Sequence, residues 1–133
     1  MKVLIIGSFI QIVHRLEEML ADIDAVKSIY TAVSHKNAAS LVDEKKPDVI
    51  LLGISLPENK SIELLGEIRK VHPYLPVIAL SISMNEYVYE QCKLLKVNHL
   101  LDTYQDFEKL TGIINEMSLI IQKDNNTGTL VTK

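Results

Sequence analysis

One stretch constrains the fold more than any other: the apolar run Val49-Ile50-Leu51-Leu52-Gly53-Ile54, which lies between Pro47 and Pro57. An uninterrupted apolar segment of strand length predicts a central strand of a parallel sheet, buried on both faces. In open α/β sheets, ligands bind beyond the carboxyl ends of the strands, so the functional site is expected around Gly53. Glycine offers no side chain there. Nothing nearby in the sequence forms a carboxylate pair, a nucleophile with a base, or a phosphate-binding glycine pattern.

The rest of the chain alternates between strand and helix patterns. Strands are predicted at 2–6, 26–32, 49–54, 77–80 and 97–101, and helices at 9–21, 35–46, 62–71, 84–95 and 107–121. Parallel strands need a crossover between them, and each crossover helix covers one face of the sheet. The pattern therefore predicts an α/β fold, a flavodoxin-like doubly wound sheet of five parallel strands in the order 2-1-3-4-5.

Several polar residues are predicted to start helices. Ser8 with Gln11, and Ser83 with Glu86, have the spacing of a capping box, while Ser34 and Asp106 are expected to cap the second and last helices. One domain is predicted over residues 1–122. The polar segment 123–133 is predicted to be a disordered tail.

Composition narrows the classes of function. The 133 residues carry a net charge of −3, with 47% hydrophobic and 23% charged residues, so no global attraction to nucleic acid or an anionic membrane is expected. Cys92 is the single cysteine, and the histidines are dispersed, so neither a disulfide nor a metal site is predicted. No apolar run is long enough for a signal peptide or a membrane span, and a cytoplasmic location is expected.

Segments along the whole chain resemble the receiver domain of bacterial two-component response regulators. The resemblance extends from Lys2 to about Ile121, and its strongest segments are Pro47–Pro57, Pro76–Ser81, Val97–Thr103 and Asp106–Leu110. It implies the same five-stranded fold. It also implies a place in phosphorelay signalling, because receivers accept a phosphoryl group from a phosphohistidine.

The residues that the resemblance assigns to the chemistry have been replaced. The phosphoacceptor aspartate falls on Gly53, and the two acids that hold magnesium fall on Gly7 and Ser8. The lysine that contacts the phosphoryl group falls on Thr103, and only Ser81 keeps the small hydroxyl residue of that position. The resemblance therefore predicts a degenerate, pseudo-receiver pocket.

A pocket of this composition is not expected to transfer phosphoryl groups. Magnesium is usually bound through one or two carboxylates, and these positions supply none. Without an aspartate no acyl phosphate forms, and without a cation nothing offsets the charge of the transition state. A serine would need a base within hydrogen-bond reach, and none is evident. The chain is therefore expected to be no enzyme and to need no cofactor.

The remaining candidate function is binding to a protein. In receivers, the surface of the fourth helix, fifth strand and fifth helix is the usual partner surface, and its aromatic switch position falls on Leu100. Tyrosines and apolar residues outside the buried stripes widen this surface, although they are also compatible with an ordinary helix face. A signalling protein or a second copy is the expected partner. The candidate interface residues are Tyr87, Tyr89, Lys93, Leu100, Ile113, Leu119 and Ile120.

Two alternatives remain open at this stage. The crevice among Gly7, Gly53 and Ser81 has space for a small ligand, although no glycine-rich phosphate loop follows the first strand. Alternatively, the chain is the regulatory fragment of a longer DNA-binding response regulator. The short segment Lys123–Lys133 is not expected to read DNA by itself.

Overall fold

The computed structural model describes the backbone of residues 1–55 and 58–131, and the side chains of residues 1–55 and 58–121. Strands and helices alternate along the chain. The strands are β1 (Lys2–Ile6), β2 (Ser28–Ala32), β3 (Val49–Ile54), β4 (Val77–Ser81) and β5 (His99–Asp102). The helices are α1 (Ile10–Ala21), α2 (His35–Lys45), α3 (Glu58–Val71), α4 (Glu86–Leu94) and α5 (Lys109–Val131).

All five strands form one parallel sheet in the order β2-β1-β3-β4-β5, as predicted. The register aligns the carboxyl ends of neighbouring strands: Ile6 pairs with Leu52, Gly53 with Leu80, and Ser81 with Asp102. The loops that follow these strands therefore meet at one edge of the sheet. This is the edge at which a site is expected in such folds.

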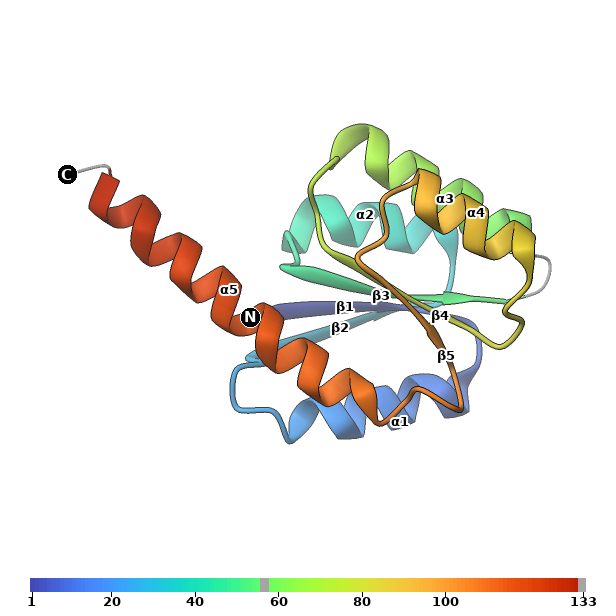
Figure 1. Cartoon of the computed structure of the whole chain (residues 1–133), viewed down its shortest axis with the longest axis horizontal. Helices are drawn as coiled ribbons and strands as arrows, with labels where there is room; N and C mark the ends of the chain where they lie inside the picture. Colours follow the sequence, from blue (N-terminus) through green and yellow to red (C-terminus); the bar gives the residue numbers. More distant parts are fainter. Residues whose placement is uncertain (56–57, 132–133) are drawn as a thin grey trace.

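The sheet separates two hydrophobic cores. Helices α2, α3 and α4 cover one face, and α1 and α5 cover the other (Figure 1). Val88 and Cys92 bring α4 into the first core, while Leu110 and Ile114 bring α5 into the second. Both faces of β3 are covered, which explains its continuous apolar sequence.

Helix caps differ from the prediction at three places. The N-cap of α1 is Phe9 without a side-chain hydrogen bond, because the Ser8 hydroxyl lies beside Ser55 instead. Asn85 caps α4 through a 2.9 Å bond from the amide of Val88, so the Ser83 capping box is wrong. Asp106 does not cap α5, because its carboxylate accepts the amide of Asp102. The Ser34 cap is confirmed by a bond from the amide of Asn37.

Two helices are longer than predicted. Helix α3 begins at Glu58, four residues earlier than predicted, and in its first turn Asn59 and Lys60 are exposed while Ser61 is buried. Helix α5 continues to Val131 and extends away from the domain body (Figure 1), so residues 123–131, predicted as a disordered tail, continue the helix. Extending an existing helix avoids the cost of a new nucleus. The domain boundary after residue 122, which the sequence analysis places there, stays a prediction.

Candidate functional site

A small cavity lies at the carboxyl edge of the sheet, where the sequence predicts the site. Its volume is about 30 Å³, roughly the share of one water molecule in the liquid. Gly7, Ser8, Gly53 and Thr103 all line it, so four of the five predicted pocket residues come together. Ser81 is fully buried next to them in the register but does not line the cavity.

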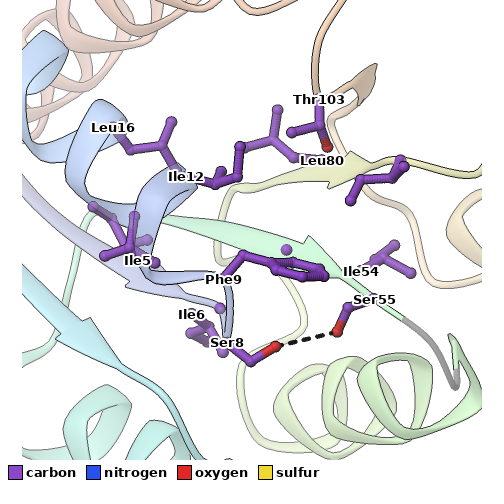
Figure 2. A pocket seen from close by; sticks show the side chains of 14 residues that line it. Ile5, Ile6, Ser8, Phe9, Ile12, Leu16, Ile54, Ser55, Leu80 and Thr103 are labelled. Atoms are coloured by element: carbon purple, nitrogen blue, oxygen red, sulfur yellow. Dashed lines mark hydrogen bonds between the residues drawn. The ribbon is translucent and has the colours of Figure 1, made fainter.

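The hydroxyl groups of this edge mostly contact one another or the backbone. The Oγ atoms of Ser8 and Ser55 lie 3.5 Å apart across the cavity (Figure 2). The Ser81 hydroxyl donates to the carbonyl of Ser83 at 2.8 Å, which occupies it at the end of β4. Thr103 is buried, and its amide donates to the carbonyl of Ser81. None of these hydroxyls has a base beside it among the contacts of the described residues.

The two glycines of the site differ in how much space surrounds them. A Cβ atom at Gly53 would lie 3.3 Å from the carbonyl oxygen of Ile6, a tight contact with backbone. A Cβ at Gly7 would lie 3.6 Å from Val13, which is ordinary packing. Neither glycine has a positive φ. Close approach of β1 therefore favours glycine at position 53, whereas position 7 has room for a side chain.

Phe9 is the residue of the site that sequence reasoning missed. The sequence pattern places it in the first turn of a helix, but its ring lies across the cavity toward Ile54 and Ser55 (Figure 2). Phe9 as a whole is 53% exposed. Phe9 also lines a second cavity of about 130 Å³, together with Ile54, Ser55, Glu58, Ile82 and Ser83. An aromatic residue directly after the loop at the end of β1 is the sequence signal that marks it.

Magnesium does not fit this site. The described residues that line the small cavity include no charged side chain. Glu58 lines the neighbouring cavity, and its carboxylate accepts a 3.0 Å bond from the amide group of Asn85. Hydroxyls and backbone carbonyls alone are a poor donor set for this ion. Nowhere in the described part of the chain do three His, Cys, Asp or Glu side chains gather as a metal site.

The turn between β5 and α5 is held by two aspartates. Asp102 Oδ1 accepts the amides of Tyr104 and Gln105, and Asp106 Oδ2 accepts the amide of Asp102 at 2.9 Å. These bonds fix Thr103 at the cavity. The bond from the backbone of Asp102, and then the bond with Lys109, lower the pKa of Asp106.

The predicted interface residues are only partly accessible. Tyr87, Tyr89 and Lys93 are exposed on α4, and Leu119 and Ile120 are 66% and 59% exposed on α5. Two others are half-buried against the cores: Leu100 packs on the core under α4, and Ile113 on the core under α5. None of the helices in the described part of the chain is both long and apolar enough to cross a membrane.

Comparisons with known proteins agree with this fold. A sequence model of the response regulator receiver domain matches residues 3–115. The response regulator GacA of Pseudomonas syringae pv. syringae (strain B728a) is 28% identical over 81 residues, which are 61% of this chain and 38% of GacA. The transcriptional regulatory protein YdfI of Bacillus subtilis (strain 168) is 31% identical over 80 residues, 60% of this chain and 37% of YdfI. The chain thus spans well under half the length of these relatives.

Solved structures show the same fold at low sequence identity. The receiver domain of the Francisella response regulator 1452 has a TM-score of 0.77 at 21% identity, covering 90% of this chain and 98% of that one. A CheY-like response regulator receiver domain protein from Methanospirillum hungatei JF-1 has a TM-score of 0.80 at 15% identity, covering 92% and 97% of the two chains.

Proposed function

The chain belongs to the response regulator receiver domain family, and from this premise we propose that it is a cytoplasmic protein-interaction module that works without phosphorylation. The observation that carries the proposal is the chemistry of the small cavity. Its described lining holds hydroxyls and alkyl groups where phosphoryl transfer needs carboxylates and a cation. The proposed role is therefore binding rather than catalysis.

The geometry of the pocket supports this proposal in two further ways. With the Phe9 ring lying across it, the cavity has a volume of about 30 Å³, which is less than a phosphoryl group with a hydrated magnesium ion needs. Moreover, an aspartate at position 53 would place its Cβ against the carbonyl oxygen of Ile6. Restoring the carboxylate alone would thus strain the site and still leave it without a cation.

Receiver domains act by contacting kinases and effectors, and this domain retains a surface for such contacts. Tyr87 and Tyr89 on α4 and Leu119 and Ile120 on α5 are the exposed members of the candidate interface. They lie on the two helices that border the edge strand β5 (Figure 1). Aromatic residues are enriched in protein interfaces. We propose this surface for a signalling protein or a second copy of the chain.

The test is exposure of the purified protein to acetyl phosphate and magnesium, followed by intact-mass measurement. No phosphoryl adduct is expected, either in the native chain or in the variant Gly53→Asp. A receiver with its aspartate intact, treated in parallel, shows that the reagent works. Light scattering with and without magnesium and beryllofluoride is expected to give one mass. A stoichiometric adduct on the native chain, or a change of mass with beryllofluoride, contradicts the proposal.

A second candidate is favoured by the length of the relatives. This chain spans 38% of GacA and 37% of YdfI, and the latter is by name a transcriptional regulatory protein. We therefore also propose, as the alternative, that the domain is the regulatory part of a longer DNA-binding protein. The length of the native reading frame decides between the two, because a frame that ends with this chain leaves no room for a DNA-binding half.

A further inference from the structure

The ring of Phe9 is a shared wall between the two cavities at the carboxyl edge of the sheet. Phe9, Ile54, Ser55 and Ile82 line both cavities, the smaller of about 30 Å³ and the larger of about 130 Å³. Phe9 precedes α1 and is about half-exposed, and its ring points toward Ile54 and Ser55 (Figure 2). Because the ring lies outside the two buried cores, it can turn outward without disturbing them. Such a rotation joins the two cavities.

The joined space has the chemistry of an apolar binding site. Its walls are mainly alkyl groups, with Leu16 and Leu80 in the smaller cavity and Ile82 in both. Ser55 lines both cavities, and the contact of its hydroxyl with Ser8 at 3.5 Å is long for a hydroxyl hydrogen bond. A pocket that is mostly apolar, with one or two polar groups to orient the ligand, is typical of small-molecule sites.

Size and charge narrow the ligand class. An apolar cavity of about 150 Å³ is enough to hold benzene, and the larger cavity here approaches that volume before the smaller one is added. Among the described residues lining either cavity, the only charged side chain is that of Glu58, held at the rim by Asn85. A carboxylate without a lining cation disfavours anions. We propose that the space around Phe9 binds an uncharged, single-ring molecule whose hydroxyl group meets Ser55, with Phe9 as the gate.

Phenol is the probe for this proposal, and benzoate is its matched anion. In an amide NMR titration of the full chain, phenol is expected to cause saturable shifts at Phe9, Ser55 and Ile82, with a dissociation constant on the order of 1 mM. Benzoate is expected to cause none at equal concentration. Absence of saturable shifts with phenol, or equal binding of benzoate, overturns the proposal. The titration involves no phosphoryl group, so its result is independent of the proposed function.

Two variants test the wall and the gate. Ile82 is 44% exposed, so Ile82→Lys is expected to fold and to weaken phenol binding at least tenfold by placing a charge in both cavities. The matched control is Val33→Lys, because Val33 is exposed at the same edge of the sheet but lines neither cavity. In Phe9→Ala, the shifts at Val13 and Leu16, which line only the smaller cavity, are expected to be larger than in the native chain, because no ring has to turn outward first. Unchanged binding in Ile82→Lys refutes the site, and shifts at Val13 and Leu16 that are no larger in Phe9→Ala than in the native chain refute the gate.

Discussion

The guanidinium of Arg69 in α3 lies against the C-terminal end of α4, where its Nε donates a 2.7 Å hydrogen bond to the carbonyl of Leu95. Its Nη2 donates to the carbonyl of Lys96, and its Nη1 donates to those of His72 and Leu75. The last carbonyls of a helix have no partner within the helix, so a cation here serves as a cap supplied by another element. One side chain thus joins α3, the turn before β4 and the end of α4.

Replacing Arg69 is therefore expected to destabilise the domain. Arg69→Ala should lower the free energy of unfolding by about 2 kcal/mol, because several carbonyls lose a charged donor. Arg69→Lys should recover part of the loss, since an ammonium cannot reproduce the planar fork. Urea denaturation measures both. Lys70→Ala, at the exposed neighbouring position, should change little; an equal loss there would show that the effect does not depend on the carbonyl contacts of Arg69.

Cys92 should make the stability fall in alkaline solution. Burial raises the pKa of its thiol from 9.0 to about 11, so the unfolded chain loses this proton first as the pH rises. The contribution of Cys92 to the free energy of unfolding is therefore present in full well below pH 9.0. Between pH 9.0 and about pH 11 this contribution is lost, by at most about 1.4 kcal/mol for each pH unit. Unfolding curves of the native chain and of Cys92→Ala isolate the effect. A parallel decline in the variant would assign it to other groups.

Asp106 should contribute to the loss of stability in acid. The amide of Asp102, and then Lys109, keep the pKa of Asp106 below its ordinary value of 3.8. A carboxyl whose pKa is lower in the folded chain stabilises the fold above that ordinary value, and its contribution disappears as the pH falls further. Asp106→Asn should therefore flatten the acid limb of a plot of unfolding free energy against pH. An unchanged acid limb would contradict this account of the turn.

The two glycines of the site should respond differently to a methyl group. Gly7→Ala is expected to stabilise the fold by about 0.4–1 kcal/mol, because the residue has room and the unfolded chain loses freedom. Gly53→Ala should be less stable than Gly7→Ala by about 1 kcal/mol, because its Cβ presses on the carbonyl of Ile6. Thermal unfolding compares the pair. Equal effects would show that the strands separate freely at this point.

The exposed apolar residues of α5 should affect association rather than folding. Leu119→Glu and Ile120→Glu replace side chains that are 66% and 59% exposed, so the free energy of unfolding should change by less than about 0.5 kcal/mol. If the chain pairs with a second copy through this surface, light scattering should show a lower mass for these variants. Thr111→Glu is the control on the same helix, at a half-buried position closer to the body. An unchanged mass for a dimeric protein would place its interface elsewhere.

The fold could be predicted from the sequence because it depends on hydrophobic patterns that extend over whole strands and helices. The apolar run of β3 and the alternation of strand and helix segments leave few arrangements that bury every apolar face. The strand order is confirmed. In the structure, Gly7, Gly53 and Thr103 lie at one edge of the sheet. A site built from strand ends follows from the topology alone, whichever side chains occupy it.

The parts that sequence reasoning missed depend on contacts between distant residues. Ser8 has the spacing of a cap, yet its hydroxyl lies beside Ser55, 47 positions along the chain. Arg69 lies in the last turn of α3, and two of its carbonyl partners, Leu95 and Lys96, are 26 and 27 residues away along the chain. The orientation of Phe9 is a similar case. Spacing along the chain carries no information about such contacts, which exist only once the elements have packed.

The division of the interior by the sheet has a consequence for any molecule that seats across β5. That strand forms one border of the sheet, with α4 anchored in one core and α5 in the other. A partner that contacts both helices would connect the two hydrophobic cores on opposite faces of the sheet. It would bind only while both cores are folded. Its attachment would then act as a check on the integrity of the whole domain, and would slow the opening of either core.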